Sequence, residues 1–294
     1  MKKAFLQLHL SVFLAGFTGV LGKLITLNEG LLVWYRLLIT AVTMWVLFSL
    51  TKKLQKVSWL QILKLSGIGF LAAMHWVTFY GSIKIANVSV ALVCFSAVGF
   101  FTAIVEPLLE QNKFNIREIL LGLLVIVGIG IIFHFDTRYK TGIILGVASA
   151  LFLAFVMVLL RRFLQKLNSE TVLTYQLSGG FIALSFFMPL YLYHFPVTTI
   201  LPGWSNFGWL LFLAWVCSVW AFTLTGNALK KLSAYTVNLS FNLEPLYGII
   251  LAFLLFKENL ELGISFYIGT LLILASVLIH TIMVWNEHKK SSKA

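Results

Sequence analysis

The chain has 294 residues, of which 60% are hydrophobic and only 11% are charged, and its formal net charge is +12. An ordinary soluble domain carries about 25% charged residues, so this composition excludes a soluble globular protein. The apolar runs are continuous and about 20 residues long, which excludes a membrane β-barrel and predicts helices that span a bilayer. Because the basic residues lie mainly in short connections between these runs, the charge does not indicate nucleic-acid binding.

Ten apolar segments follow one another along the chain and predict an all-α integral membrane protein with ten transmembrane helices. The first segment follows two lysines, as in a signal peptide, but it is long enough to span the membrane and no soluble domain follows it. We therefore expect an uncleaved first helix. The predicted spans are residues 5–27, 30–50, 59–83, 87–109, 116–135, 141–160, 171–193, 206–229, 233–256 and 261–285.

The number of basic residues alternates from one connection to the next. Fifteen of the 22 Lys and Arg residues lie at the two termini and in the connections after the second, fourth, sixth and eighth spans, whereas the other connections hold four. Short cytoplasmic connections of membrane proteins are enriched in Lys and Arg. The sequence therefore predicts a multi-pass protein of the cell (inner) membrane with both termini in the cytoplasm.

Ten spans divide naturally into two five-helix halves, residues 1–140 and 141–294. Because five is an odd number, the second half must enter the membrane from the opposite side, which gives an inverted-topology repeat. Lys23 of the first half has a counterpart in Arg162, about 140 residues later. The sequence thus predicts two inverted five-helix repeats.

An acidic residue within a predicted span is the clearest candidate for a functional site. An ionised side chain at the bilayer centre costs about 2.5–3.5 kcal/mol on insertion scales. Glu244 lies near the middle of the span 233–256, and the following Pro245 weakens the helix because it cannot donate the usual backbone hydrogen bond. A charge beside a weakened helix at mid-depth is typical of transporter binding sites. Glu244 is therefore a candidate site for substrate or a proton; the alternative is a structural ion pair with Arg36 or Lys23.

Two asparagines, Asn238 and Asn242, lie four residues apart on one face of the same span, whereas Ser240 and Glu244 lie nearly opposite. A helix with polar groups on two sides cannot face lipid and must lie between other helices or beside a watery cavity. Asn238 and Asn242 are therefore candidates to contact substrate, although hydrogen bonds between helices explain them equally well.

Further candidates for the translocation pathway lie in the first four spans. Lys23 is close enough to the outer surface for its long side chain to reach water, whereas Arg36 is deeper and its guanidinium suits a carboxylate, either of Glu244 or of a substrate. His75 can change its charge near neutral pH, but a lone histidine in an apolar helix more often bonds a neighbouring helix. The other two candidates are Trp76, beside His75, and Ser96, in a stripe of small residues that favours close packing.

Four segments match the pattern of a known family, namely Phe17–Lys23, Tyr35–Arg36, Phe79–Val93 and Asn238–Glu258. Through them the chain shows a resemblance to the drug/metabolite transporter superfamily, in particular its EamA-type permeases. This resemblance implies secondary transport of amino acids, related amphipathic metabolites or drugs, often outward and without ATP. The family's pattern also has a proline midway along the fourth helix, whereas this chain has Gly99 near that position and its proline at Pro107.

Two other function classes remain as alternatives. A membrane channel or scaffold would normally show a filter sequence or rely on oligomeric rings, and a membrane-embedded enzyme would need a cluster of catalytic residues. We expect no cofactor and no metal; the two cysteines, Cys94 and Cys217, lie inside apolar runs and indicate neither a disulfide framework nor a zinc site. The expected partners are a small-molecule substrate and the lipid bilayer, with no nucleic acid. The sequence leaves open the solute, proton coupling and homodimer formation.

Overall fold

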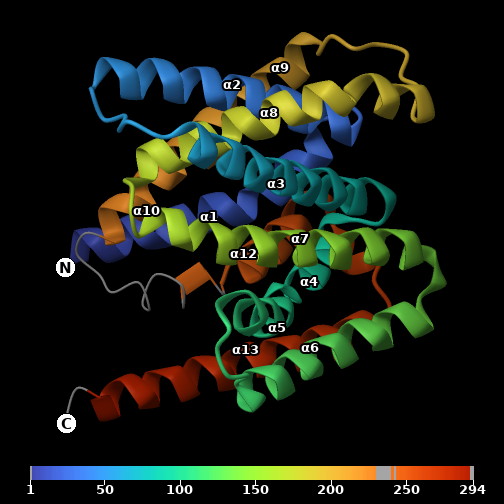
Figure 1. Cartoon of the computed structure of the whole chain (residues 1–294). Coiled ribbons are helices and arrows are strands. Elements are labelled where there is room, and N and C mark those ends of the chain that lie inside the picture. The colour runs from blue at the N-terminus through green and yellow to red at the C-terminus, as the bar shows by residue number, and fades with distance from the viewer. Residues whose placement is uncertain (1, 230–239, 242, 292–294) are drawn as a thin grey trace.

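The computed structural model describes residues 2–229, 240–241 and 243–291, and in this part of the chain it contains helices but no strands. The long helices run roughly side by side in one bundle (Figure 1). α1 begins and α13 ends at the same end of the bundle, where the N- and C-termini are marked. The predicted all-α class is confirmed.

The elements follow the predicted spans closely, with two interruptions. α4 and α5 together occupy the predicted fourth span, and a π-helical turn, η2, interrupts the eighth. The bounds are α1 Lys2–Leu24, α2 Glu29–Leu50, α3 Trp59–Ile85, α4 Val88–Phe95, α5 Val98–Glu110, α6 Ile116–Phe135, η1 Thr137–Tyr139, α7 Lys140–Leu164, α8 Ser169–His194, α9 Trp204–Ala214, η2 Trp215–Trp220, α10 Ala221–Leu229, α12 Glu244–Phe256, η3 Glu258–Leu260 and α13 Ile264–Ser291.

Nine helical segments of the described residues are long and apolar enough to cross a membrane. The predicted ninth span is represented by α12, which has 13 residues and is too short to cross a bilayer alone. Residues 230–239 and 242, which include Asn238 and Asn242, lie outside the described part of the chain. A multi-pass helical membrane protein is therefore established, and the count of ten spans stays a prediction.

Asparagine and serine side chains define where several helices begin. Asn28, Asn87 and Asn168 each precede a helix, and their side-chain oxygens accept hydrogen bonds from backbone N–H groups two or three residues later, at 2.8, 2.8 and 2.9 Å. Ser58 and Gln61 form a reciprocal capping box at the start of α3. Such caps satisfy N–H groups that the first turn of a helix leaves without partners.

Glycines allow two pairs of helices to cross with their backbones in contact. A Cβ atom added to Gly69 of α3 would lie 1.9 Å from the carbonyl oxygen of Gln176 in α8, and one added to Gly180 would lie 2.5 Å from the carbonyl oxygen of Gly69. Gly128 of α6 and Gly269 of α13 face each other in the same way. Small residues let helices approach closely in membranes, where packing is a main source of helix association.

The helices α5 and α12 are alike in length and in the backbone at both ends. Each has 13 residues, and their first residues, Val98 and Glu244, are 146 positions apart. Each ends before a residue in the left-handed region, Gln111 in one case and Lys257 in the other, both with φ of 55°. The fourth span is thus broken before Val98, near the position of the expected proline, even though proline is absent there. In the second predicted repeat, α12 begins at the corresponding position.

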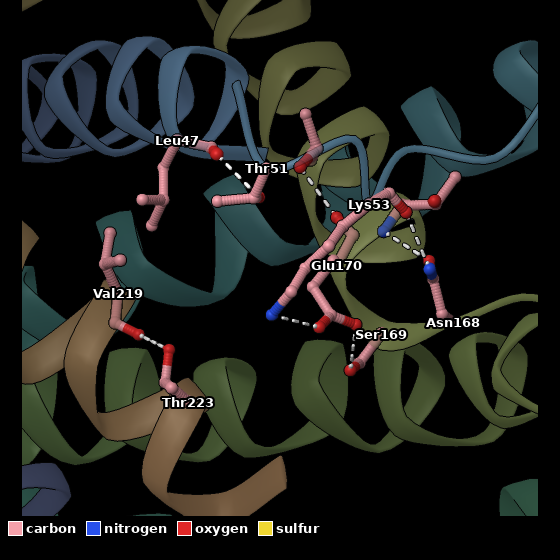
Figure 2. Close-up of polar contacts among 10 residues, drawn as sticks. Leu47, Thr51, Lys53, Asn168, Ser169, Glu170, Val219 and Thr223 are labelled. Carbon is pink, nitrogen blue, oxygen red and sulfur yellow. Dashed lines mark hydrogen bonds and ion pairs between the residues drawn. The ribbon is translucent and has the colours of Figure 1, made fainter. Parts of the chain in front are cut away.

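The helices α2 and α8 are joined along their whole length. Their contacts include the hydrogen bonds Tyr191 Oη to Glu29 Oε1 (2.7 Å), Trp34 Nε1 to Ser185 Oγ (2.8 Å) and Trp45 Nε1 to Ser178 Oγ (2.8 Å). At the end of α2, Lys53 forms a 3.2 Å ion pair with Glu170, and Asn168 donates to the Lys53 carbonyl oxygen at 2.7 Å (Figure 2). These contacts at several depths hold the two helices as one unit.

Candidate functional site

Arg36 of α2 lies in the interior of the bundle with only 4% of its surface exposed. Its Nη1 donates a hydrogen bond to the Tyr80 hydroxyl at 2.8 Å, and its Nε and Nη2 donate to Ser218 Oγ at 3.3 and 3.2 Å. The guanidinium carbon lies 4.3 Å from the centre of the Trp76 ring. Neutral groups from α3 and η2 therefore position the arginine, and none of the described residues forms an ion pair with it.

The Arg36 guanidinium retains donors for an additional ligand. It has five N–H groups, and the three hydrogen bonds above leave two without a partner among the described residues. None of the ion pairs in this part of the chain includes Arg36. The Thr40 hydroxyl, on the same helix, is buried, has no hydrogen-bond partner among the residues that the structure describes, and lines the same crevice. Because a buried, uncompensated charge is costly, this arrangement favours binding of an anionic group.

The crevice beside Arg36 is closed in this conformation and has no room for a water molecule. It is lined by Arg36, Leu37, Thr40, Trp76, Leu177, Ser218 and Phe222. Ser218 enters it from the π-helical turn, and its hydroxyl donates to the carbonyl oxygen of Leu213, five residues earlier, at 3.0 Å. π-Helical turns inside α-helices are often found at functional sites. No residue pattern in the sequence predicts this turn, and Ser218 is therefore absent from the predicted site residues.

Glu244 is the first residue of α12, and Pro245 follows it in the first turn. A proline is tolerated there because the N–H groups of a first turn have no partner within the helix. The Glu244 side chain is half-buried and forms no hydrogen bond or ion pair with any described residue, although the Arg36 charge acts on it electrostatically. The weakened helix predicted from Pro245 is therefore a helix start, with a carboxylate available at it.

The absence of an Arg36–Glu244 ion pair gives a prediction for stability. If the two side chains act separately, the changes in unfolding free energy caused by Arg36→Ala and Glu244→Ala should add in the double variant, with a coupling energy below about 1 kcal/mol. Thermal melts in detergent measure it. A direct buried pair would instead make each single change costly, by about 3–5 kcal/mol, and the double change would recover part of that loss.

Lys23 pairs with a carboxylate other than Glu244. Its Nζ lies 2.9 Å from Oε1 of Glu258, in the connection after α12, and 4.5 Å from the centre of the Phe256 ring. Glu258 is fully buried and also accepts hydrogen bonds from the backbone N–H groups of Val88 and Ser89, at 3.1 and 2.9 Å. The ion pair therefore joins α1, the end of α12 and the start of α4.

The other predicted site residues lie apart from Arg36 or hold helices together. His75 Nδ1 lies 2.8 Å from the hydroxyl oxygen of Ser149 in α7, which matches the role of bonding a neighbouring helix. Ser96 is half-buried at the junction of α4 and α5, and its hydroxyl donates to the Leu92 carbonyl oxygen at 3.3 Å. Of the predicted residues, the structure thus brings Arg36 and Trp76 into direct contact.

A bundle of membrane-spanning helices with an arginine and carboxylates in its interior defines a polytopic membrane protein with an internal polar site. The family model of the EamA-like transporter family matches residues 2–134 and again residues 140–282. The chain therefore belongs to the EamA-like transporter family, as the resemblance predicted.

Two known proteins are similar to this chain over most of its length. A Haemophilus influenzae protein named as an uncharacterized transporter is 26% identical over 244 residues, which cover 76% of this chain and 74% of that protein. A solved crystal structure has a TM-score of 0.64 at 15% identity and covers 97% of this chain and 99% of its own. At that identity the second likeness shows the fold alone. The family and the relative indicate a transporter rather than an enzyme.

Proposed function

We propose that this protein is a secondary active transporter that exports small metabolites bearing a carboxylate, such as amino acids or related amphipathic compounds, by alternating access. The observation that carries this proposal is Arg36, a buried cation with two N–H donors that no described residue uses. A carboxylate matches the planar fork of a guanidinium and would neutralise its charge. The Trp76 ring and the Thr40 hydroxyl would line the same site.

The remaining candidates take separate roles in this proposal. Glu244 would bind a proton or the amino group of the solute, since its carboxylate has no hydrogen bond or ion pair with a described residue and can accept either. Asn238 and Asn242 would add polar contacts from the segment before α12, and Ser96 would do so from the break in the fourth span. His75 would position α3 against α7 rather than contact the solute.

The proposed setting is the cell (inner) membrane, with both termini in the cytoplasm. The distribution of Lys and Arg over the connections supports this orientation. In the structure, α1 begins at the end of the bundle where α13 ends (Figure 1), as an even number of spans requires. An exporter in this orientation would take its solute from the side on which the termini lie.

A competition experiment in sealed vesicles tests the proposed solute class. The purified protein would be reconstituted with one labelled amino acid at a time, and uptake would be competed by free acids, their methyl esters and the corresponding amines, with and without a pH gradient. We expect the free acids to compete at least tenfold better than the esters, because only they can pair with Arg36. Equal competition by acids and esters would contradict the carboxylate site. A rate that responds to the pH gradient would support proton coupling.

A further inference from the structure

Two ion pairs join the first helix of one predicted repeat to the fourth span of the other. Lys23, in the last turn of α1, pairs with Glu258 just after α12, at 2.9 Å. Arg162, in the last turn of α7, pairs with Glu110 at the end of α5, at 2.6 Å. α1 and α7 run in opposite directions (Figure 1). The first pair therefore lies at the end of the bundle away from the termini, and the second lies at the end that holds them.

The two pairs occupy related positions in the repeats. Lys23 and Arg162 are counterparts in the sequence, and each lies in the last turn of the first helix of its half. Their acidic partners adjoin Lys257 and Gln111, the two left-handed residues that end α12 and α5. An inverted repeat places such equivalent positions on opposite faces of the membrane. The ion pairs are thus counterparts at the two ends of the bundle.

The pairs differ in how firmly they are held in this conformation. The Glu258 carboxylate is fully buried and accepts three further hydrogen bonds, from the backbone N–H groups of Val88 and Ser89 and from the Ser89 hydroxyl at 2.6 Å. The Lys23 side chain is 36% exposed, whereas the side chains of Arg162 and Glu110 are 45% and 35% exposed. Solvent weakens an exposed pair much more than a buried one. The Glu258 carboxylate is therefore held more firmly than the Glu110 carboxylate.

We propose that Lys23–Glu258 and Arg162–Glu110 are the two gates of the transporter, one at each face of the membrane, and that they open in alternation. Both pairs are formed in this conformation, which is therefore closed at the Arg162–Glu110 end and also at the Lys23–Glu258 end. Opening that end requires the Glu258 carboxylate to leave both Lys23 and the first turn of α4. The inference rests on the proposed alternating access, and it assigns the residues that control access from each side.

The test measures access to the interior and needs no solute, so its outcome is separate from that of the transport assay. Cys94 and Cys217 are first replaced by alanine, and Thr40→Cys then serves as a reporter in the Arg36 crevice. A membrane-impermeant thiol reagent is added to membrane vesicles of both orientations. Glu258→Gln should speed labelling from the outer side at least threefold, and Glu110→Gln should speed it from the inner side instead.

A second variant and a control keep the test decisive. Lys23→Met breaks the same pair as Glu258→Gln while the carboxylate keeps its contacts with α4, so it should shift labelling towards the same side by a smaller factor. Lys53→Met is the control, because the Lys53–Glu170 pair (Figure 2) joins helices that are held together along their length. It should leave labelling unchanged from both sides. The proposal is overturned if the Glu258 and Glu110 variants shift labelling towards the same side, or if neither variant shifts it.

Discussion

The Glu244→Gln variant should reach wild-type levels in the membrane yet transport solute at least about tenfold more slowly, a loss of about 1.4 kcal/mol or more in transition-state stabilisation. Glutamine keeps the shape of glutamate but cannot be ionised or pass on a proton. Because the Glu244 side chain has no hydrogen bond or ion pair with any described residue, the change breaks no contact seen in the structure. Initial rates in proteoliposomes, normalised to the amount of inserted protein, measure the effect.

Glu118→Gln is the matched control for Glu244→Gln. Glu118 lies in the first turn of α6, as Glu244 lies in the first turn of α12, but its carboxylate is exposed at the bundle surface. The same chemical change there should leave the rate within about twofold of the wild type. A Glu244→Gln protein that inserts normally and transports at the wild-type rate would remove Glu244 from the proposed site.

The apolar runs predicted most of the fold because the bilayer imposes a strict length on each helix. The predicted span 59–83 and the observed α3, Trp59–Ile85, agree within two residues, and the capping serine before Trp59 explains the shared start. Arg36 could also be predicted to lie in the interior of the bundle, since a basic residue within a membrane span almost always faces other helices or a water-filled cavity rather than lipid. These features depend on local sequence alone.

The partner of Lys23 could not be predicted in the same way. Glu258 lies near a predicted membrane surface, where an acidic residue is ordinarily solvated. Its burial depends on the start of α4, about 170 residues earlier, whose backbone N–H groups bind the carboxylate. One local signal was present, because Asn87 begins α4 with a cap that leaves the N–H groups of the next residues available for another acceptor.

The break in the fourth span shows the limit of reasoning from proline. The expected proline is absent near Gly99, and Pro107 lies within α5 without interrupting it. The chain nevertheless leaves the helix between Phe95 and Val98, as it begins α12 at Glu244 in the second half. The π-helical turn at Ser218 likewise has no proline or glycine to mark it. Both depend on packing between distant segments, which a single sequence does not display.

The largest effect on stability should come from Gly69→Ala. A Cβ atom at this position would lie 1.9 Å from the carbonyl oxygen of Gln176 and 2.6 Å from the backbone nitrogen of Gly180, both in α8. Backbone atoms cannot rotate away as the end of a side chain can, so α3 and α8 would have to separate. Overpacking of this kind costs about 1–3 kcal/mol and sometimes more. We therefore expect a fall of several degrees in the melting temperature measured in detergent.

Gly67, two residues earlier on the same helix, provides the control for this last prediction. A Cβ atom there would meet nothing within 4 Å, and the residue is exposed. Gly67→Ala makes the same chemical change in the same helix, so any general effect of alanine on α3 appears in both variants. Its melting temperature should stay close to that of the wild type, because substitutions at exposed positions usually change stability by no more than about 0.5 kcal/mol. If Gly69→Ala and Gly67→Ala have the same melting temperature, the close crossing of α3 and α8 does not hold the bundle together.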